Sequence, residues 1–208
     1  MKQTPQPSEL TERDEPADGR TLRRTRNRTA VITALLDMIR EGDLHPGAAE
    51  IAERAGVSHR SIFRYFDDLD DLVRTTIDQA FQEARPLSTI PDAGSGTLDQ
   101  RVAALVDARL ALFAFVDGPM QLARMRSYSI PSIDEEISMI TEEFRVQIAE
   151  HFAAELSGQP HPEREFLVDA ILVLTSYDAY SIHTRLLASP VERTRAAWIT
   201  AVAALLRT

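Results

Sequence analysis

The sequence predicts an all-α protein of about nine helices, with a three-helix domain at the N-terminus followed by a larger helical domain. Apolar residues recur every three to four positions in several long segments, which is the pattern of amphipathic helices. No segment shows the period-two alternation of a half-buried strand, and clusters of glycine and proline separate the helical segments. A chain of 208 residues is long enough to bury a sizeable core in one or two domains.

Composition limits the class of protein. The absence of cysteine excludes a disulfide framework, a thiolate metal site and a cysteine nucleophile, and it suits a reducing compartment. The N-terminus lacks the apolar core of a signal peptide, and no apolar run approaches the roughly 18 residues of a membrane span. We therefore expect a cytoplasmic protein that makes no membrane contact.

The first part of the chain divides into a tail and a helix. Residues 1–20 contain three prolines, many charges and almost no large apolar side chains, so they predict a flexible tail. Val31 and Leu35 belong to an apolar stripe that predicts a first helix from about Thr25 to Glu41. Gly42 is expected to end that helix.

Residues 21–68 predict a helix-turn-helix domain. Two short helices are expected over Ala48–Ala55 and Ser58–Tyr65, and Gly56 between them can adopt the left-handed conformation of a sharp turn. The Ser58 side chain is expected to cap the second of these helices by accepting from backbone amides of its first turn.

The second short helix carries polar donors on the side that packing does not need. These residues are His59, Arg60, Ser61 and Arg64. Donors of this kind bind phosphates and base edges when a helix lies in the major groove. The alternative interpretation is an ordinary αα-hairpin with a solvated basic face.

The motif resembles the TetR family of one-component regulators. The resemblance rests on IAERAGVS at residues 51–58 followed by SIFRYF at residues 61–66, and it extends from about Arg26 to about Leu72. It implies a homodimer in which a small DNA-binding domain is joined to a larger all-helical domain that binds an effector and dimerises.

Three positions depart from the family pattern. Gly47 stands where the family usually has Thr, Phe63 where it usually has Tyr, and Leu69 where it usually has Lys. Those family residues tend to contact phosphates, so three backbone contacts are in doubt, and Arg60 and Arg64 are possible replacements. The candidate DNA-binding residues are Arg23, Arg24, Arg26, Arg28, Gly47, Ser58, His59, Arg60, Ser61, Phe63, Arg64 and Tyr65.

Charge is unevenly distributed along the chain. The net charge is -9, but residues 20–66 contain nine basic and five acidic side chains and so carry +4, whereas residues 67–208 carry -10. A basic module attached to an acidic body directs one face of the molecule toward a polyanion. A mild local bias without function is the alternative.

Four aspartates between residues 67 and 71 invite a metal-site interpretation. The cluster lacks the glycine and glutamate spacing of a calcium loop, whereas aspartates at a helix start cap free amides. We therefore expect no metal, and a fourth helix over Asp68–Arg85 that links the two domains. Pro86–Thr97 predicts a loop.

Residues 69–208 predict the second domain, entirely helical. We expect helices over Leu98–Val116, Met120–Tyr128, Ser132 or Ile133 to Leu156, Glu163–Leu187, and Val191–Leu206. Asp117-Gly118-Pro119 is expected to break the chain between the first two, and Ser189-Pro190 to start the last as N-cap and first helical residue. The last two segments are expected to form the dimer interface. Candidate interface residues are Leu167, Ile171, Leu174, Ile182, Leu186, Trp198, Val202 and Leu205.

An effector pocket is expected within the second domain. Aromatic residues and methionines supply burial and a few polar groups fix orientation, as an apolar ligand requires. Candidate pocket residues are Phe113, Met120, Arg124, Met125, Tyr128, Met139, Phe144, Tyr177 and Tyr180. Arg124 or Arg126 would favour an anionic ligand, although helical spacing turns at most one of them inward. An ordinary helical core is the alternative.

No arrangement of residues predicts catalysis. The sequence has no glycine-rich phosphate loop, no G-x-S-x-G elbow and no H-E-x-x-H motif, and the histidines stand apart. We predict a non-enzymatic regulator without a cofactor, whose partners are an operator duplex, a small-molecule effector and a second copy of the chain. A TetR-like carrier or protein-binding module with weakened DNA binding is the alternative function, and a small helical enzyme is the third.

Overall fold

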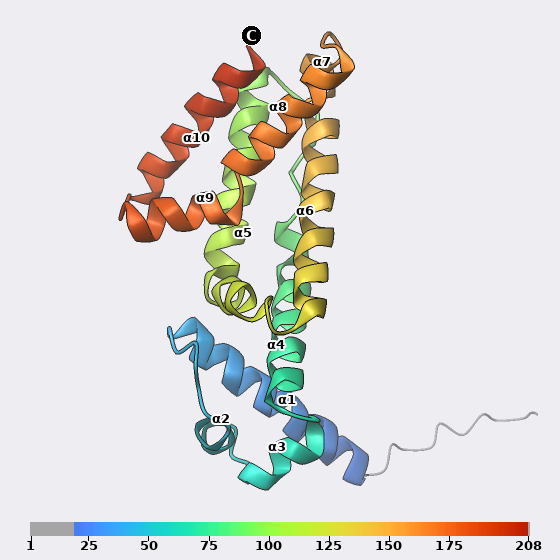
Figure 1. The fold of residues 1–208 in the computed structure, drawn as a ribbon, viewed down its shortest axis with the longest axis vertical. Coiled ribbons are helices and arrows are strands. Elements are labelled where there is room, and N and C mark those ends of the chain that lie inside the picture. Colours follow the sequence, from blue (N-terminus) through green and yellow to red (C-terminus); the bar gives the residue numbers. More distant parts are fainter. Residues whose placement is uncertain (1–18, 208) are drawn as a thin grey trace, which may run out of the picture.

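The computed structural model describes residues 19–207, apart from the Arg20 side chain, so most of the tail predicted at 1–20 lies outside the described residues. The described residues form ten α-helices and two single turns of other helix types, and none of them forms a strand (Figure 1). The all-α class is therefore confirmed. None of the described helices is both long and apolar enough to cross a bilayer.

The N-terminal domain consists of α1 (Gly19–Arg40), α2 (Ala48–Arg54) and α3 (His59–Tyr65). α1 begins six residues earlier than predicted, because the basic stretch before Thr25 is already helical. Gly56 has a φ of +65°, as the turn between α2 and α3 requires, and the Ser61 amide donates to Ser58 Oγ over 3.2 Å.

The connecting helix α4 (Leu69–Ala84) runs from the N-terminal domain into the second domain (Figure 1). Asp68 caps it by accepting from the Asp71 amide at 2.8 Å, and Asp71 in turn pairs with Arg74 over 2.6 Å. The clustered aspartates thus act as caps and ion-pair partners. A 3₁₀ turn, Arg85–Leu87, and a loop follow, close to the predicted loop.

The predicted break at residues 117–119 is wrong, because α5 (Leu98–Arg126) continues through Pro119. Val116, Pro119 and Met120 are all buried, so packing on several sides holds the helix despite the missing amide donor. Figure 1 shows α5 changing direction in its last turns, which is the bend that an internal proline produces.

Two long predicted helices are each divided. The helix predicted to reach Leu156 ends at His151 and gives α6 (Pro131–His151) and α7 (Ala153–Leu156). His151 and Phe152 are both buried, and a straight helix would point such neighbours about 100° apart. The bend at Phe152 brings both side chains into the core.

The segment predicted as Glu163–Leu187 forms α8 (His161–Leu174), α9 (Tyr177–Ser181) and a π-helical turn, Ile182–Leu186. Ser176 caps α9, and the bend before it directs Tyr177 and Tyr180 onto the Phe113 ring. The last helix, α10 (Val191–Leu206), has the predicted bounds, but its N-cap is Pro190 and not Ser189.

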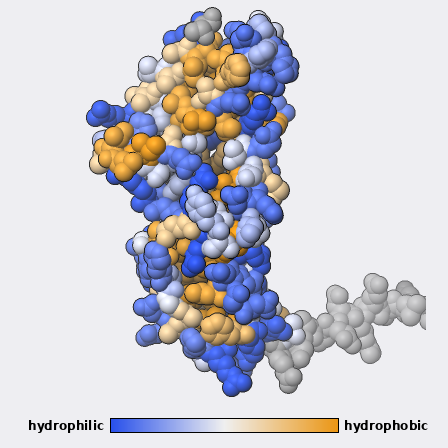
Figure 2. Space-filling view, in the orientation of Figure 1, coloured by the Kyte–Doolittle hydropathy of each residue, from blue (hydrophilic) through white to orange (hydrophobic). Residues whose placement is uncertain are grey.

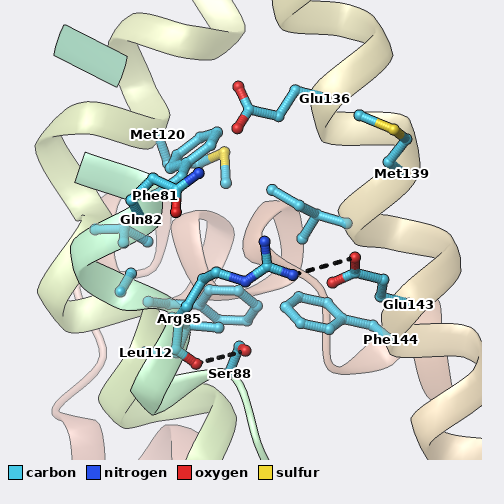
Figure 3. A pocket seen from close by; sticks show the side chains of 14 residues that line it. Phe81, Gln82, Arg85, Ser88, Leu112, Met120, Glu136, Met139, Glu143 and Phe144 are labelled. Carbon is cyan, nitrogen blue, oxygen red and sulfur yellow. Dashed lines mark hydrogen bonds and ion pairs between the residues drawn. The ribbon is translucent and has the colours of Figure 1, made fainter. Parts of the chain in front are cut away.

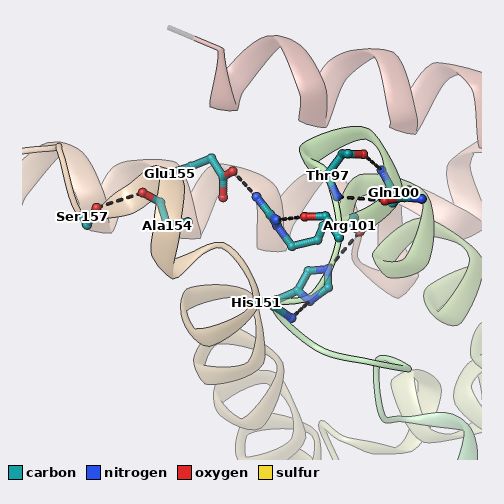
Figure 4. Close-up of polar contacts among 9 residues, drawn as sticks. Thr97, Gln100, Arg101, His151, Ala154, Glu155 and Ser157 are labelled. Carbon is teal, nitrogen blue, oxygen red and sulfur yellow. Dashed lines mark hydrogen bonds and ion pairs between the residues drawn. The ribbon is translucent and has the colours of Figure 1, made fainter.

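The loop between α4 and α5 is fixed by polar contacts (Figure 4). His151 accepts from the Gly94 amide at Nδ1 (3.0 Å), and its Nε2 lies 2.9 Å from the Arg101 carbonyl, to which it donates. Arg101 also binds the Gly96 carbonyl and forms a buried ion pair with Glu155 of α7. Burial lowers the pKa of His151, so the neutral ring fits this position.

One hydrophobic cluster runs through both domains. It includes Ile51 and Ile62 in the N-terminal domain, Ile77 in α4, and Phe113 and Phe144 in the second domain. A second cluster at the far end joins α5, α6, α8 and α10. The two domains therefore share a continuous core along α4.

Candidate DNA-reading surface and ligand cavities

The exposed face of α3 carries His59, Arg60, Phe63 and Arg64, while Ile62 and Tyr65 of the same helix are buried. His59 packs edge-on against the Phe63 ring, with ring centroids 5.2 Å apart. Arg60 makes no hydrogen bond or ion pair with the described residues, so its guanidinium is available to an external partner.

Tyr65 lies in a different position from the one that its candidate role requires. Its ring is buried, and its hydroxyl accepts from Asn27 Nδ2 of α1 at 3.2 Å and from Arg64 at 2.6 Å. The Asn27 hydrogen bond lowers the pKa of Tyr65, and burial opposes that shift. Tyr65 thus joins α1 to α3 and holds Arg64 against its own ring, 4.9 Å from the centroid.

The candidate arginines of α1 do not all point the same way. Arg23, Arg24 and Arg26 are exposed, whereas Arg28 is half-buried and lies 4.9 Å over the Phe66 ring. The first three can approach a phosphate backbone, while Arg28 also holds α1 against the end of α3.

Two of the three departures from the family pattern have structural roles. The Gly47 amide donates to Glu50 Oε2 over 2.7 Å, closing the first turn of α2. Leu69 is half-buried against the main hydrophobic cluster. Phe63 stays exposed on α3. Ser58 and Ser61 share a hydrogen bond between their hydroxyl oxygens, 2.8 Å apart, so both serve the helix start.

The two domains meet where α1, α4 and α5 converge. Arg40 at the end of α1 pairs with Glu83 of α4 at 3.2 Å, and Arg126 of α5 pairs with Asp70 of α4 at 3.4 Å. α1 also passes so close to α5 that a Cβ on Gly118 would lie 2.7 Å from the Ile39 carbonyl oxygen. A shift of α4 or α5 therefore disturbs α1.

A first cavity of about 260 Å³ lies between α4, α5 and α6 (Figure 3). Its walls are mainly aromatic and aliphatic, and the charged groups come from α6 and from the turn after α4. Arg85 and Glu143 form an ion pair of 3.7 Å across it. The lining residues are Phe81, Gln82, Ala84, Arg85, Ser88, Leu112, Phe113, Val116, Met120, Glu136, Met139, Ile140, Glu143 and Phe144.

A second cavity of about 270 Å³ lies on the other side of Phe113, Met120, Ile140 and Phe144, which line both spaces. It also contacts Arg124, but that guanidinium is paired with Asp178 at 2.7 Å. The lining residues are Phe113, Met120, Arg124, Ile137, Ile140, Thr141, Phe144, Leu172, Val173, Ser176, Tyr177 and Asp178.

Six of the nine candidate pocket residues line one or both cavities: Phe113, Met120, Arg124, Met139, Phe144 and Tyr177. Tyr180 lies behind them, buried against Phe113 and Tyr177. Met125 and Tyr128 line neither cavity, because Met125 is exposed in the last turn of α5 and Tyr128 stands in the turn after it, where it is 97% exposed.

Sequence reasoning missed the contribution of α4, most notably Phe81, and the acid Glu136 of α6. Phe81 belongs to the apolar stripe of α4, which periodicity identifies without saying what faces it. Glu136 stands in a run of three acids that suggested only a solvated face.

Glu136 is the half-buried acid of the first cavity. Burial raises the pKa of Glu136 to about 7, and the carboxylate of Asp78 on α4, which shares a hydrogen bond with it, adds to the shift. Asp78 also accepts from Arg74 at 3.1 Å. Near neutral pH Glu136 is therefore protonated part of the time.

Arg109 lies beneath the ring of Phe144, with its guanidinium carbon 3.6 Å from the ring centroid. Its side chain is buried, donates to Gln147 Oε1 at 3.2 Å, and forms no ion pair with the described residues. Burial lowers its pKa to about 10. Phe144 thus separates this cation from both cavities.

The N-terminal part of the chain matches a known protein family. Residues 31–76 match the family model described as bacterial regulatory proteins, tetR family, a span that contains α2, α3 and half of α4. No curated protein matches the chain.

Solved structures match most of the chain. A tetR-family transcriptional regulator from Streptomyces coelicolor has 20% identity and a TM-score of 0.70, covering 87% of this chain and 80% of its own. A transcriptional regulator from Rhodococcus sp. Rha1 has 20% identity and a TM-score of 0.67, covering 86% and 96%. The multidrug binding protein EbrR, solved with imidazole, has 19% identity and a TM-score of 0.56, covering 96% and 97%.

The resemblance to TetR-family transcriptional regulators is therefore confirmed, by the family match over residues 31–76 and by a fold shared over most of the chain. Regulators of this family are transcription factors and not enzymes, as the sequence predicted.

Proposed function

We propose that this TetR-like chain is a transcriptional repressor that binds a palindromic operator as a homodimer and leaves it when a small molecule occupies the cavities beside α4. The observation that carries the proposal is the exposed face of α3, where Arg60 and Arg64 project from a helix whose opposite face is buried. A helix held in this way can enter the major groove with its donors toward base edges and phosphates.

The two arginines have different expected roles. Arg60 makes no hydrogen bond or ion pair with described residues, so it can turn toward a base edge, whereas Arg64 is held by Tyr65 at the end of α3 and suits a phosphate. Arg60→Ala is then expected to cost about 1–3 kcal/mol on the operator and much less on random duplex. Arg64→Ala is expected to weaken binding to both duplexes similarly.

The measurement starts from genomic fragments selected by the purified protein, followed by fluorescence anisotropy of labelled duplexes at several salt concentrations. Arg207→Ala is the control, because this exposed arginine pairs with Asp99 at the opposite end of the molecule. Equal losses for Arg60→Ala on operator and random duplex would remove Arg60 from the base-reading set. Absence of any salt-dependent duplex binding would favour the carrier function, which the altered positions Gly47 and Leu69 leave open.

The homodimer is proposed to form through α8 and α10, with one correction to the residues expected there. Ile171, Trp198 and Val202 are buried in the monomer, so they belong to its core. Phe166 and Val173 are each 69% exposed and lie two turns apart on α8. Figure 2 shows further apolar surface at the corner where α9 approaches α10, the region of Leu186, Leu187 and Val191.

Two copies packed on this surface would present two α3 helices to successive major grooves, about one helical turn apart or a multiple of it. An effector then releases DNA by favouring a pose with the wrong spacing, and it can do so only through its different affinities for the two poses. EbrR is described as a multidrug binding protein and was solved with imidazole, which supports a ligand-binding role for the second domain.

A further inference from the structure

The first cavity combines an apolar interior with charged groups that do not balance, at α6 and in the turn after α4. α5 contributes only Leu112, Phe113, Val116 and Met120 to the lining, and the charged lining groups come from α6 and from the turn after α4. In Figure 3, Glu136 and Glu143 project from α6 toward the side of the cavity formed by Phe81, Gln82 and Arg85. The acids therefore face the gap between α4 and α6.

Acids outnumber bases around this gap. Arg85, Glu136 and Glu143 line the cavity, and Arg74 and Asp78 face Glu136, so two arginines and three carboxyl groups give a net charge of -1 when all are ionised. Arg74 pairs with Asp78 and with Asp71, and Arg85 pairs with Glu143. Glu136 forms no ion pair with a described residue and shares its hydrogen bond with another acid, Asp78. The charged groups that face Glu136 are Arg74, Asp78 and Arg85.

We propose that the first cavity binds an organic amine with an aromatic or apolar body, whose ammonium group lies between Glu136 and Asp78. The ammonium takes the place of the Glu136 proton in the hydrogen bond to Asp78, and that proton leaves to solvent. The apolar body lies among Phe81, Phe113 and Phe144, whose ring faces also attract a cation. The inference that the amine is the effector rests on the proposed function. The inference that the cavity binds an amine does not depend on that function.

An anionic ligand, which Arg124 or Arg126 suggested from the sequence, is less well matched. Arg124 is paired with Asp178, Arg126 with Asp70, and Arg85 with Glu143. The buried guanidinium of Arg109 has no carboxylate partner among the described residues, but the Phe144 ring covers it. Glu136, which has no arginine partner among the described residues, is part of the cavity wall. Arg109, which has no carboxylate partner among them, is not.

The test compares three probes that differ only in their polar end: 4-phenylbutylamine, 4-phenylbutan-1-ol and 4-phenylbutyrate. Isothermal titration calorimetry of the full chain is expected to give the amine an affinity at least about tenfold higher than the alcohol, because only the amine brings a positive charge to the carboxylate and forms an ion pair with it. The butyrate is expected to bind most weakly.

Glu136→Gln keeps the shape of the side chain and removes its charge. It is expected to abolish the preference for the amine while leaving the alcohol unchanged. Glu135→Gln is the matched control, because Glu135 is the exposed neighbour on α6 and does not line the cavity. Amine affinity of the wild type should also rise about tenfold from pH 6 to pH 8, as Glu136 with a pKa near 7 becomes ionised. The alcohol affinity should not change.

Equal affinities for amine and alcohol, a preference for the butyrate, or no binding of the amine would each overturn the proposal. If Glu136→Gln does not fold, the three probes and the pH series on the wild type still decide it. These measurements use no DNA, so operator binding without amine binding would refute this inference alone. Amine binding without any duplex binding would refute the regulatory function and leave the site.

Discussion

The close packing of α5 on α1 at Gly118 gives the sharpest prediction, because the two expected effects of Gly118→Ala have opposite signs. Gly118 lies inside α5, where replacing glycine with alanine ordinarily stabilises a helix by about 1 kcal/mol. Here the new Cβ would lie 2.7 Å from the Ile39 carbonyl oxygen and 3.1 Å from Ile39 Cγ2. The nearer atom belongs to the backbone of α1, so a rotamer change cannot relieve the contact.

Relief requires α1 and α5 to separate by several tenths of an ångström. Overpacking of this kind costs about 1–3 kcal/mol, so after the helix gain the net destabilisation is between zero and about 2 kcal/mol. For a chain of this length each kcal/mol corresponds to roughly 2–4 °C in Tm. We expect a lower Tm together with weaker operator binding, since α1 and α3 are held together by the hydrogen bond from Asn27 to Tyr65.

The assay is thermal unfolding and operator anisotropy on the same preparations. Gly158→Ala is the control, because its Cβ would meet no atom within 4 Å and its backbone does not need glycine. An increase in Tm for Gly118→Ala with unchanged operator affinity would refute the reasoning, since it would mean that α1 does not press on α5 at this point.

Three further predictions concern Phe166 at the proposed dimer interface, His151 beside the loop between α4 and α5, and Tyr65 of α3. Phe166→Glu should dissociate the dimer and abolish operator binding without lowering monomer stability, because the side chain is 69% exposed in the monomer. Sedimentation measures the oligomeric state and circular dichroism the stability, and a variant that stays dimeric would place the interface elsewhere. Burial lowers the pKa of His151 in the folded state, so the unfolded chain takes up the proton first and stability should fall as the pH drops below about 6.5. Urea unfolding from pH 8 to pH 5 should show a steeper loss for the wild type than for His151→Gln, and parallel curves would contradict the neutral role of this ring. Tyr65→Phe removes the hydrogen bonds that the hydroxyl accepts from Asn27 of α1 and from Arg64, and each is worth about 0.5–1.5 kcal/mol. Urea unfolding should therefore detect a loss of stability. Weaker DNA binding with unchanged stability would instead indicate that Tyr65 contacts a phosphate.

The N-terminal domain could be predicted closely because its signals are local. Ser58 caps α3 and Asp68 caps α4 as their positions implied, and Gly56 has the left-handed conformation expected between α2 and α3. Each of these features depends on a backbone hydrogen bond or a φ angle within a few residues, which a short stretch of sequence largely determines.

The second domain was predicted less well because its breaks depend on distant contacts. Pro119 does not end α5, since burial on both sides of it holds the helix, whereas Phe152 bends the chain without any glycine or proline signal. The cavity walls follow the same rule. Periodicity predicts that both Phe81 and Tyr128 are on helices. In the structure Phe81 lines a cavity because α4 packs against α5 and α6, whereas Tyr128 stands in the turn after α5 and meets solvent.

The position of α4 explains how a ligand in the first cavity can act on α3, which the ligand does not touch. The 16 residues of α4 extend about 24 Å, with Asp70 near one end and Phe81 near the other. Both ends belong to the same hydrophobic cluster, so the helix moves as a unit within a continuous core. If α4 behaves as a rigid rod of this length, a tilt of about 5° displaces its far end by about 2 Å. In a two-fold dimer the displacement occurs twice in opposite directions, so a small change between Glu136 and Asp78 becomes a change of several ångströms in the separation of the two α3 helices.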